Sequence, residues 1–87
     1  MAAIPVGRSP HAVDVNPRTN RVYVANRESN EVTVIDGESL EVLATVAVGE
    51  EPWDVAVDPT TGRIFVSNHR SGTVSVIDGH RNSIIRT

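Results

Sequence analysis

The side chains that could bind or transform a ligand stand in short polar stretches between apolar segments. The candidate ligand-binding set is His11, Arg27, Trp53, Asp54, His69 and Arg70. Glu50 and Glu51, near Asp54, could form an acid–base group, although such carboxylates are usually solvated loop residues. The three histidines are spaced unlike any metal-ligating motif, and no Ser/His/Asp arrangement or glycine-rich phosphate loop is recognisable. The residues therefore predict no catalysis, no cofactor and no bound metal.

The composition excludes several classes of function. The chain has 87 residues, a formal net charge of −3 and no cysteine. A negative balance argues against nucleic acid, which attracts basic surfaces, and no apolar run reaches the roughly 18–20 residues of a membrane span. The opening MAAIPVG lacks the basic and apolar regions of a signal peptide. Because a monomer this short buries only about 60% of its unfolded surface, we expect it to need a partner.

The chain consists of two copies of one sequence unit. Val6 aligns with Val48 without a gap, which gives a period of 42 residues, and 17 of the 40 aligned pairs are identical. Ordinary residue usage would give about two or three identities by chance. The repeat predicts a first unit at 1–47, including the end of a preceding outer strand at 2–7, and a second unit at 48–87.

Each unit contains four short segments with the composition of β-strands. In the first unit they are residues 11–15, 21–26, 31–36 and 41–48. They are rich in Val, Ile, Thr and Tyr, and turn signals separate them every 8–12 residues or so, which is typical of an all-β fold. No window has helical periodicity. Each unit is therefore predicted to be a four-stranded antiparallel meander.

The turn residues support this division. A positive φ is expected at Asn20, Asn30, Gly62 and Gly72, because Asn and Gly tolerate the left-handed region best. The Asp-Gly pairs at 36–37 and 78–79 predict hairpins between the third and fourth strands. Asn26 and Asn68, which end the second strands, are expected to cap the following loops through Asx turns.

A 42-residue four-stranded meander in tandem fits a β-propeller blade. The segments YVAN (23–26) and FVSN (65–68) resemble the Tyr-Val-Thr-Asn signature of the YVTN family of propeller repeats. The flanking pieces also resemble it, with VGRSPHAVDVNP and VGEEPWDVAVDP before the signature and NEVTVIDG and GTVSVIDG after it. Relatives include prokaryotic cell-surface and surface-layer proteins, and similar propellers occur in lactonases and streptogramin lyases.

The resemblance implies a location for the candidate residues. In such propellers the loop that enters a blade shares one face with the loop between its second and third strands, around the mouth of the central channel. His11 and Trp53 occupy the same repeat position, so we interpret them mainly as packing residues of the channel rim. The alternative is that a symmetric ring of His11 side chains holds a metal.

Two blades cannot close a propeller, since propellers of this kind usually have about seven blades. Two blades leave two apolar sheet faces exposed, and the repeat makes these faces complementary. Such a head-to-tail contact can close into a ring. Whole chains allow only even blade numbers, so the predicted partner is the chain itself, as a homotrimer of six blades or a homotetramer of eight.

The sequence therefore favours a self-assembling structural or binding scaffold without intrinsic catalysis. One alternative is a fragment of an extracytoplasmic cell-surface YVTN propeller, and another is a fragment of a catalytic propeller of the lactonase or lyase type. The sequence leaves the localisation open. The resemblance implies that a full-length parent would be extracytoplasmic or at the cell surface.

Overall fold

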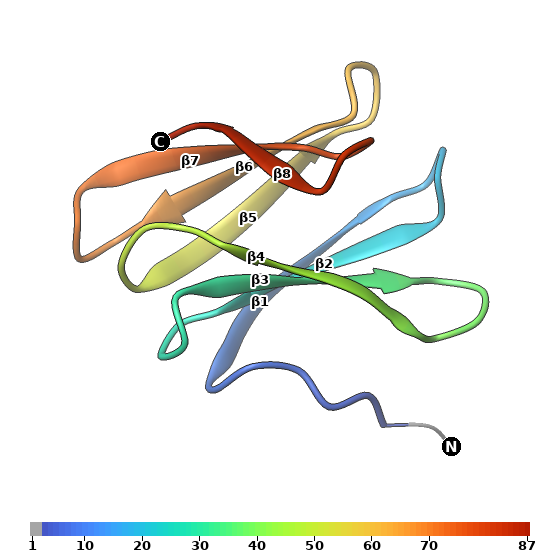
Figure 1. Cartoon of the computed structure of the whole chain (residues 1–87), viewed down its shortest axis with the longest axis horizontal. Coiled ribbons are helices and arrows are strands. Elements are labelled where there is room, and N and C mark those ends of the chain that lie inside the picture. The colour runs from blue at the N-terminus through green and yellow to red at the C-terminus, as the bar shows by residue number, and fades with distance from the viewer. Residues whose placement is uncertain (1–2) are drawn as a thin grey trace.

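The fold consists of eight strands in two antiparallel sheets (Figure 1). This computed structural model describes residues 3–87. The first sheet contains β1 (Pro10–Asn16), β2 (Arg21–Asn26), β3 (Glu31–Asp36) and β4 (Val42–Ala47), and the second contains β5 (Pro52–Asp58), β6 (Arg63–Asn68), β7 (Thr73–Asp78) and β8 (Ser83–Arg86). In each sheet the strands pair in sequence order. The predicted all-β fold of four-stranded antiparallel meanders is confirmed.

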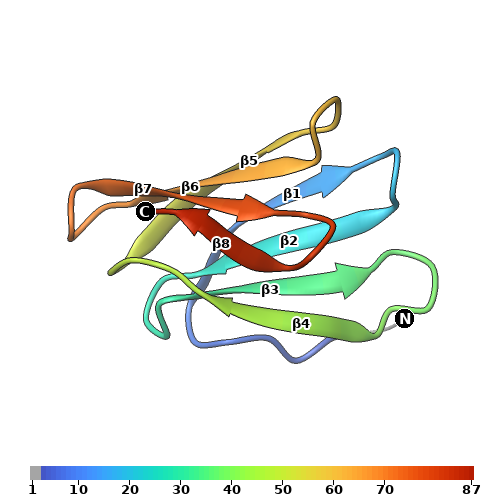
Figure 2. The ribbon, with the colours of Figure 1, turned by 45° about the horizontal axis from the view of Figure 1, so that its top comes forward.

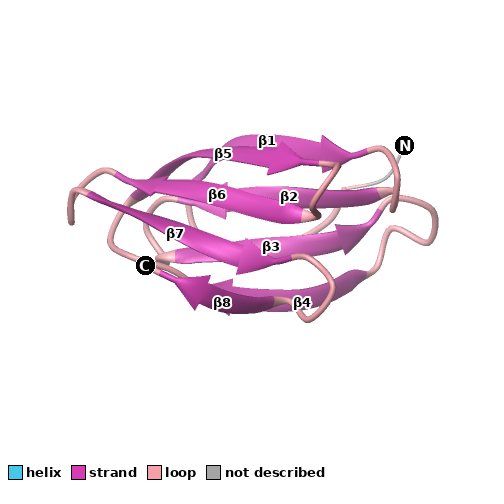
Figure 3. Ribbon diagram, turned by 90° about the horizontal axis from the view of Figure 1, so that it is seen from above, coloured by secondary structure: helices cyan, strands magenta, loops and turns pink. Residues whose placement is uncertain are grey.

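The two sheets pack face to face. Figure 2 and Figure 3 show the second sheet lying over the first, with β5 beside β1. The contact between the sheets is most extensive where β5 packs against β1 and β2, and a smaller contact joins β4 to β8. No part of residues 3–87 forms a helix suited to crossing a bilayer.

All six hairpins of the described chain use the same turn. Each begins at an Asn or Asp that ends a strand, and the fourth residue after it has a positive φ, at Asn20, Asn30, Leu40, Gly62, Gly72 and Asn82. In the second sheet, for example, the Gly62 N–H donates to the Asp58 carbonyl at 2.8 Å. The four predicted positive-φ residues are therefore confirmed. In the third hairpins, however, the left-handed residue is Leu40 or Asn82 and not part of the Asp-Gly pair.

Positions 37 and 79 require glycine because the backbone of another loop passes close to them. The Gly37 N–H donates to the Asn20 carbonyl at 2.7 Å, and the Gly79 N–H donates to the Gly62 carbonyl at 3.0 Å. A Cβ on Gly37 would lie 2.7 Å from the same Asn20 oxygen. The Asp-Gly pair thus joins the third hairpin loop to the first one, where no larger residue fits.

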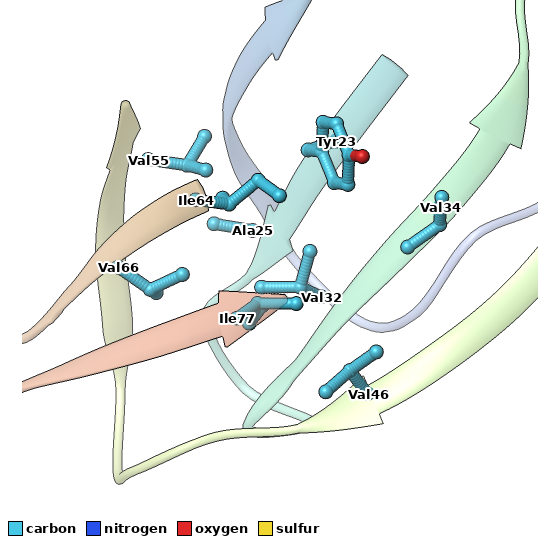
Figure 4. Close-up of a cluster of buried hydrophobic side chains, with 9 residues drawn as sticks. All are labelled: Tyr23, Ala25, Val32, Val34, Val46, Val55, Ile64, Val66 and Ile77. Carbon is cyan, nitrogen blue, oxygen red and sulfur yellow. The ribbon is translucent and has the colours of Figure 1, made fainter. Parts of the chain in front are cut away.

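The hydrophobic core lies between the two sheets (Figure 4). It contains Tyr23, Ala25, Val32, Val34 and Val46 from the first sheet and Val55, Ile64, Val66 and Ile77 from the second. These side chains come from alternate positions of each strand, as the two-residue period of a strand requires. The other face of each sheet is left without a second layer, and exposed Val13 and Val74 mark these open faces.

Candidate ligand face and blade junction

The loops that carry most of the candidate residues meet at one end of the sheets. In the first sheet the Arg27 N–H donates to the Ser9 carbonyl at 2.9 Å. In the second sheet the His69 N–H donates to the Glu51 carbonyl, also at 2.9 Å. These bonds tie the segment before each first strand to the loop after the second strand. In Figure 1 this end is where β4 leads into β5.

Trp53 is the centre of a cluster that contains four of the six candidate residues. Its ring packs against the rings of both His11 and His69, with centroid distances of 4.1 Å and 5.2 Å. The Arg27 guanidinium carbon lies 5.5 Å from the Trp53 ring centroid, within cation–π range. His11 Nδ1 is 2.7 Å from the Trp53 carbonyl oxygen. The cluster therefore joins the rim of the first sheet to that of the second.

The carboxylates near this cluster have separate partners. Glu51 Oε1 lies 3.6 Å from Arg27 Nε and 3.9 Å from His69 Nδ1. Glu50 Oε2 lies 3.8 Å from the Nε of exposed Arg70, the fifth candidate. The sixth candidate, Asp54, is not part of the cluster. It borders a hollow on the open face of the second sheet, together with Phe65 and Val74.

A polar cleft of about 230 Å³ opens beside the cluster. Its lining consists of Arg8, Arg27, Arg70, Glu28, Glu50, Glu51 and Asn30. The lining carries charges of both signs, which suits a small polar molecule better than an apolar one. Across residues 3–87, no group of three or more His, Asp or Glu side chains is placed to hold a metal ion.

Asn26 and Asn68 are buried inside the blades, and their predicted role as loop caps is wrong. The Asn26 Nδ2 donates to Thr33 Oγ1 at 2.8 Å, and the Asn68 Nδ2 donates to Ser75 Oγ at 2.9 Å. Both amides therefore hold the third strand, because their side chains face the sheet and not the loop. By contrast, Asp36 does cap its loop through the Glu38 N–H at 2.8 Å.

The cap on Asp36 has an electrostatic consequence. Hydrogen bonds from the Glu38 and Ser39 N–H groups stabilise the charged carboxylate and lower the pKa of Asp36 below its usual value. Tyr23 shows the opposite effect of burial. Desolvation raises the pKa of the Tyr23 hydroxyl, and the nearby Arg21 guanidinium opposes part of this rise.

Three further hydrogen bonds cross between the sheets, and sequence reasoning missed all of them. Asp14 Oδ2 accepts from the Val57 N–H at 2.8 Å, and the Arg21 Nη1 donates to the Gly79 carbonyl at 2.7 Å. Nearer the rim, the Glu51 N–H donates to Asn30 Oδ1 at 2.9 Å. A difference between the repeats could have indicated two of these bonds. Asp14 corresponds to Ala56 and Asn30 to Gly72, and neither Ala56 nor Gly72 has a side chain that can accept a hydrogen bond.

Two antiparallel meanders that converge along their first strands define adjacent blades of a β-propeller. The family described as "Lactonase, 7-bladed beta-propeller" matches residues 2–84, so the chain belongs to this family. The predicted β-propeller is therefore confirmed. No curated protein matches the sequence.

Among solved structures, a chain of the hydrazine synthase of Kuenenia stuttgartiensis is similar. The TM-score is 0.87 with 27% sequence identity, and the match covers 99% of this chain. It covers 24% of the hydrazine synthase chain, so the present chain spans about a quarter of that relative's length.

Proposed function

We propose that this chain is a two-blade propeller module that binds further copies of itself through its two open sheet faces and serves as a structural or binding scaffold. The support comes from an internal comparison between repeats. Val32 and Val74 are the same residue at the same repeat position, yet Val32 is 0% exposed and Val74 is 51% exposed. The face around Val74 is therefore chemically equivalent to one that is already covered by a blade.

The opposite open face gives the same result. Val55 in the second blade is 6% exposed, whereas its equivalent Val13 in the first blade is 63% exposed. The residues around these positions also correspond closely, since Val24 matches Val66 and Ile35 matches Ile77. Either open face therefore has the pattern that the other needs, as a head-to-tail ring requires.

The number of blades is limited by geometry. Six blades are set about 60° apart and eight about 45°, on either side of the roughly 51° of a seven-bladed ring. Three copies need one association fewer than four, and each association costs several kcal/mol of translational and rotational freedom. This favours the homotrimer slightly over the homotetramer.

Native mass spectrometry and light scattering test the proposal directly. Three copies of the 9.4 kDa chain have a mass of about 28 kDa, and four have about 38 kDa. Either mass supports the module. A cooperatively folded 9.4 kDa monomer at micromolar concentration would contradict it.

The resemblance of YVAN and FVSN to the YVTN signature supports an extracytoplasmic or cell-surface setting for a longer parent protein. In such a parent, further 42-residue repeats would cover the open faces in place of copies. The sequence of the surrounding gene tests this version, since additional repeats together with a signal peptide would favour it.

A second candidate function is catalysis at the rim, because the chain belongs to a family of lactonase propellers. Glu51, Arg27 and His69 lie together there, and a carboxylate beside a guanidinium and an imidazole could act on a polar substrate. The test is hydrolysis of sugar lactones by the assembled protein, compared with Glu51→Gln. A lyase-type activity would instead require a divalent metal, which calorimetry would detect. Turnover that Glu51→Gln abolishes would favour catalysis over the scaffold.

A further inference from the structure

The first strand of each blade is an edge strand of its sheet, and some of its backbone amides point to this free edge, the inner edge of a propeller blade. The N–H groups of Val15, Val55 and Val57 donate to Asp side chains and not to the neighbouring strand. In an antiparallel strand, residues two positions apart direct their N–H groups the same way. The Val13 N–H therefore also points away from β2, to the open inner edge of the first blade.

Asp14 shows how such amides are satisfied across a junction. Its Oδ1 accepts from the Val15 N–H of its own blade, and its Oδ2 accepts from the Val57 N–H of the next blade, both at 2.8 Å. Val57 is the repeat equivalent of Val15. One carboxylate thus bonds the same amide position in two adjacent blades.

In the second blade the carboxylate stands two residues earlier. Ala56 occupies the position equivalent to Asp14, and Asp54 occupies the position equivalent to an alanine of the first blade. Asp54 Oδ1 accepts from the Val55 N–H of its own blade at 2.9 Å. Its Oδ2 has no donor within residues 3–87. The repeat equivalent of Val55 in a first blade is Val13.

We infer that Asp54 closes the junction between two copies of this chain by accepting a hydrogen bond from the Val13 N–H of the next copy. This inference rests on the proposed self-assembly and identifies one hydrogen bond between neighbouring copies. With the bond in place, all four axis-facing amides have a carboxylate acceptor. The offset also keeps Asp54 and Asp14 at different levels along the axis, so that two carboxylates do not meet.

A second contact fixes the same partner at the other end of the junction. Inside the chain, Arg21 of the first blade donates to the Gly79 carbonyl of the second at 2.7 Å. Arg63 has the position of Arg21 on the open face and is exposed, and Gly37 is the equivalent of Gly79. Arg63 therefore donates to the Gly37 carbonyl of the next copy. Both ends of the open face thus match a second copy in the register of the internal junction.

Asp54→Asn tests the carboxylate, because it keeps the shape but replaces one acceptor oxygen with an NH₂ donor. A hydrogen bond to a charged group contributes enough that each junction should weaken by roughly tenfold or more. Glu41→Gln is the matched control, since it removes the same charge from an exposed loop position. Concentration-dependent light scattering measures both. The double variant Asp54→Ala/Ala56→Asp should stay weak, because its new carboxylate would face Asp14 and an amide already bonded.

Amide hydrogen exchange followed by NMR gives a direct readout. In the assembly the Val13 amide should be protected, and Asp54→Asn should remove this protection while leaving that of Val57, which depends on Asp14. Assembly with no effect of Asp54→Asn on the Val13 amide would overturn the inferred contact and leave self-assembly intact. A chain that stays a folded 9.4 kDa monomer at micromolar concentration would overturn both.

Discussion

Tyr23 is a residue whose ionisation reports on the interface between the two blades. It is the only tyrosine, and the chain contains no lysine, so few other groups titrate near pH 10. The side chain is 1% exposed in the core between the sheets. Burial raises its pKa above the usual 10.0 because the phenolate would lose its hydration.

The raised pKa of Tyr23 predicts a loss of stability in alkali. The unfolded chain ionises first, so the free energy of unfolding should fall as the pH rises through about 10. Urea unfolding between pH 8 and 11, with tyrosinate absorbance as a second signal, measures the effect. Tyr23→Phe is the control, because the second repeat has Phe65 at this position. If the pH profile of the Phe variant matched that of the wild type, Tyr23 would not be the source.

The rim histidines should differ in their contribution to stability. His11→Ala loses the bond to the Trp53 carbonyl and the closer ring contact, so it should destabilise by about 1 kcal/mol. His69→Ala removes a ring whose side chain is 67% exposed and whose contact with Trp53 is longer, so it should cost less than about 0.5 kcal/mol. Thermal midpoints and solution masses of both variants check this. Loss of assembly in His69→Ala would assign that residue a structural role instead.

At the scale of the elements, the shared turn explains why the two repeats exchange Asn and Gly so freely. Leu40 is the exception, since it has a φ of 64° and is the only branched aliphatic residue among the six turn positions. It is 45% exposed, so little packing compensates for its backbone strain. Its equivalent in the second blade is Asn82, which tolerates this conformation better.

Leu40→Asn should therefore stabilise the chain by about 0.5–1 kcal/mol, because it relieves the left-handed strain. Chemical unfolding of the variant and the wild type under the same conditions measures the difference. A destabilising result would mean that the exposed Leu40 side chain packs on something outside a single chain.

Gly62 tests the same turn in the opposite direction. Gly62→Val places a β-branched residue at a φ of 75° and should cost roughly 1–2 kcal/mol. Gly62→Asn should cost much less, because Asn20 has the equivalent place in the first repeat. Comparing the two unfolding free energies decides the matter, and equal costs would show that backbone strain is not what limits this position.

At the scale of the whole molecule, substitutions of Val32 and Val74 distinguish an effect on folding from an effect on assembly. Val32→Asp would bury an unpaired charge between the blades, so it should prevent folding altogether. Val74→Asp places the same charge on an open face, so it should prevent assembly instead. The wild-type melting temperature should rise with protein concentration, as binding of copies stabilises the folded state.

Calorimetry over a range of concentrations, with far-UV circular dichroism, distinguishes the two variants. Val74→Asp should show a lower melting temperature that does not depend on concentration. A wild type whose melting temperature is also independent of concentration would contradict assembly through these faces.

The sequence by itself determined the strands, the turns and the number of blades. The strands at 21–26 and 31–36 were predicted with their observed bounds. The turn residues also predict the positive φ angles observed at Asn20 and Gly62. These features depend on neighbours in the chain, because strand propensity and turn chemistry are local. The common location of His11, Arg27 and His69 at one end of the sheets follows from the resemblance to YVTN propellers and not from these local signals.

Only the tertiary structure decided what the side chains contact. Asp14 and Val57 lie 43 positions apart, and nothing local indicates that a carboxylate of one blade bonds an amide of the next. Asn26 faces a strand hydroxyl and not its own loop for the same reason, since its orientation depends on how the sheet packs. Val32 and Val74 are indistinguishable in the repeat, yet one is buried and the other exposed. Whether a side chain is buried depends on which surfaces pack together. In this chain each blade has one face packed against the other blade and one face exposed.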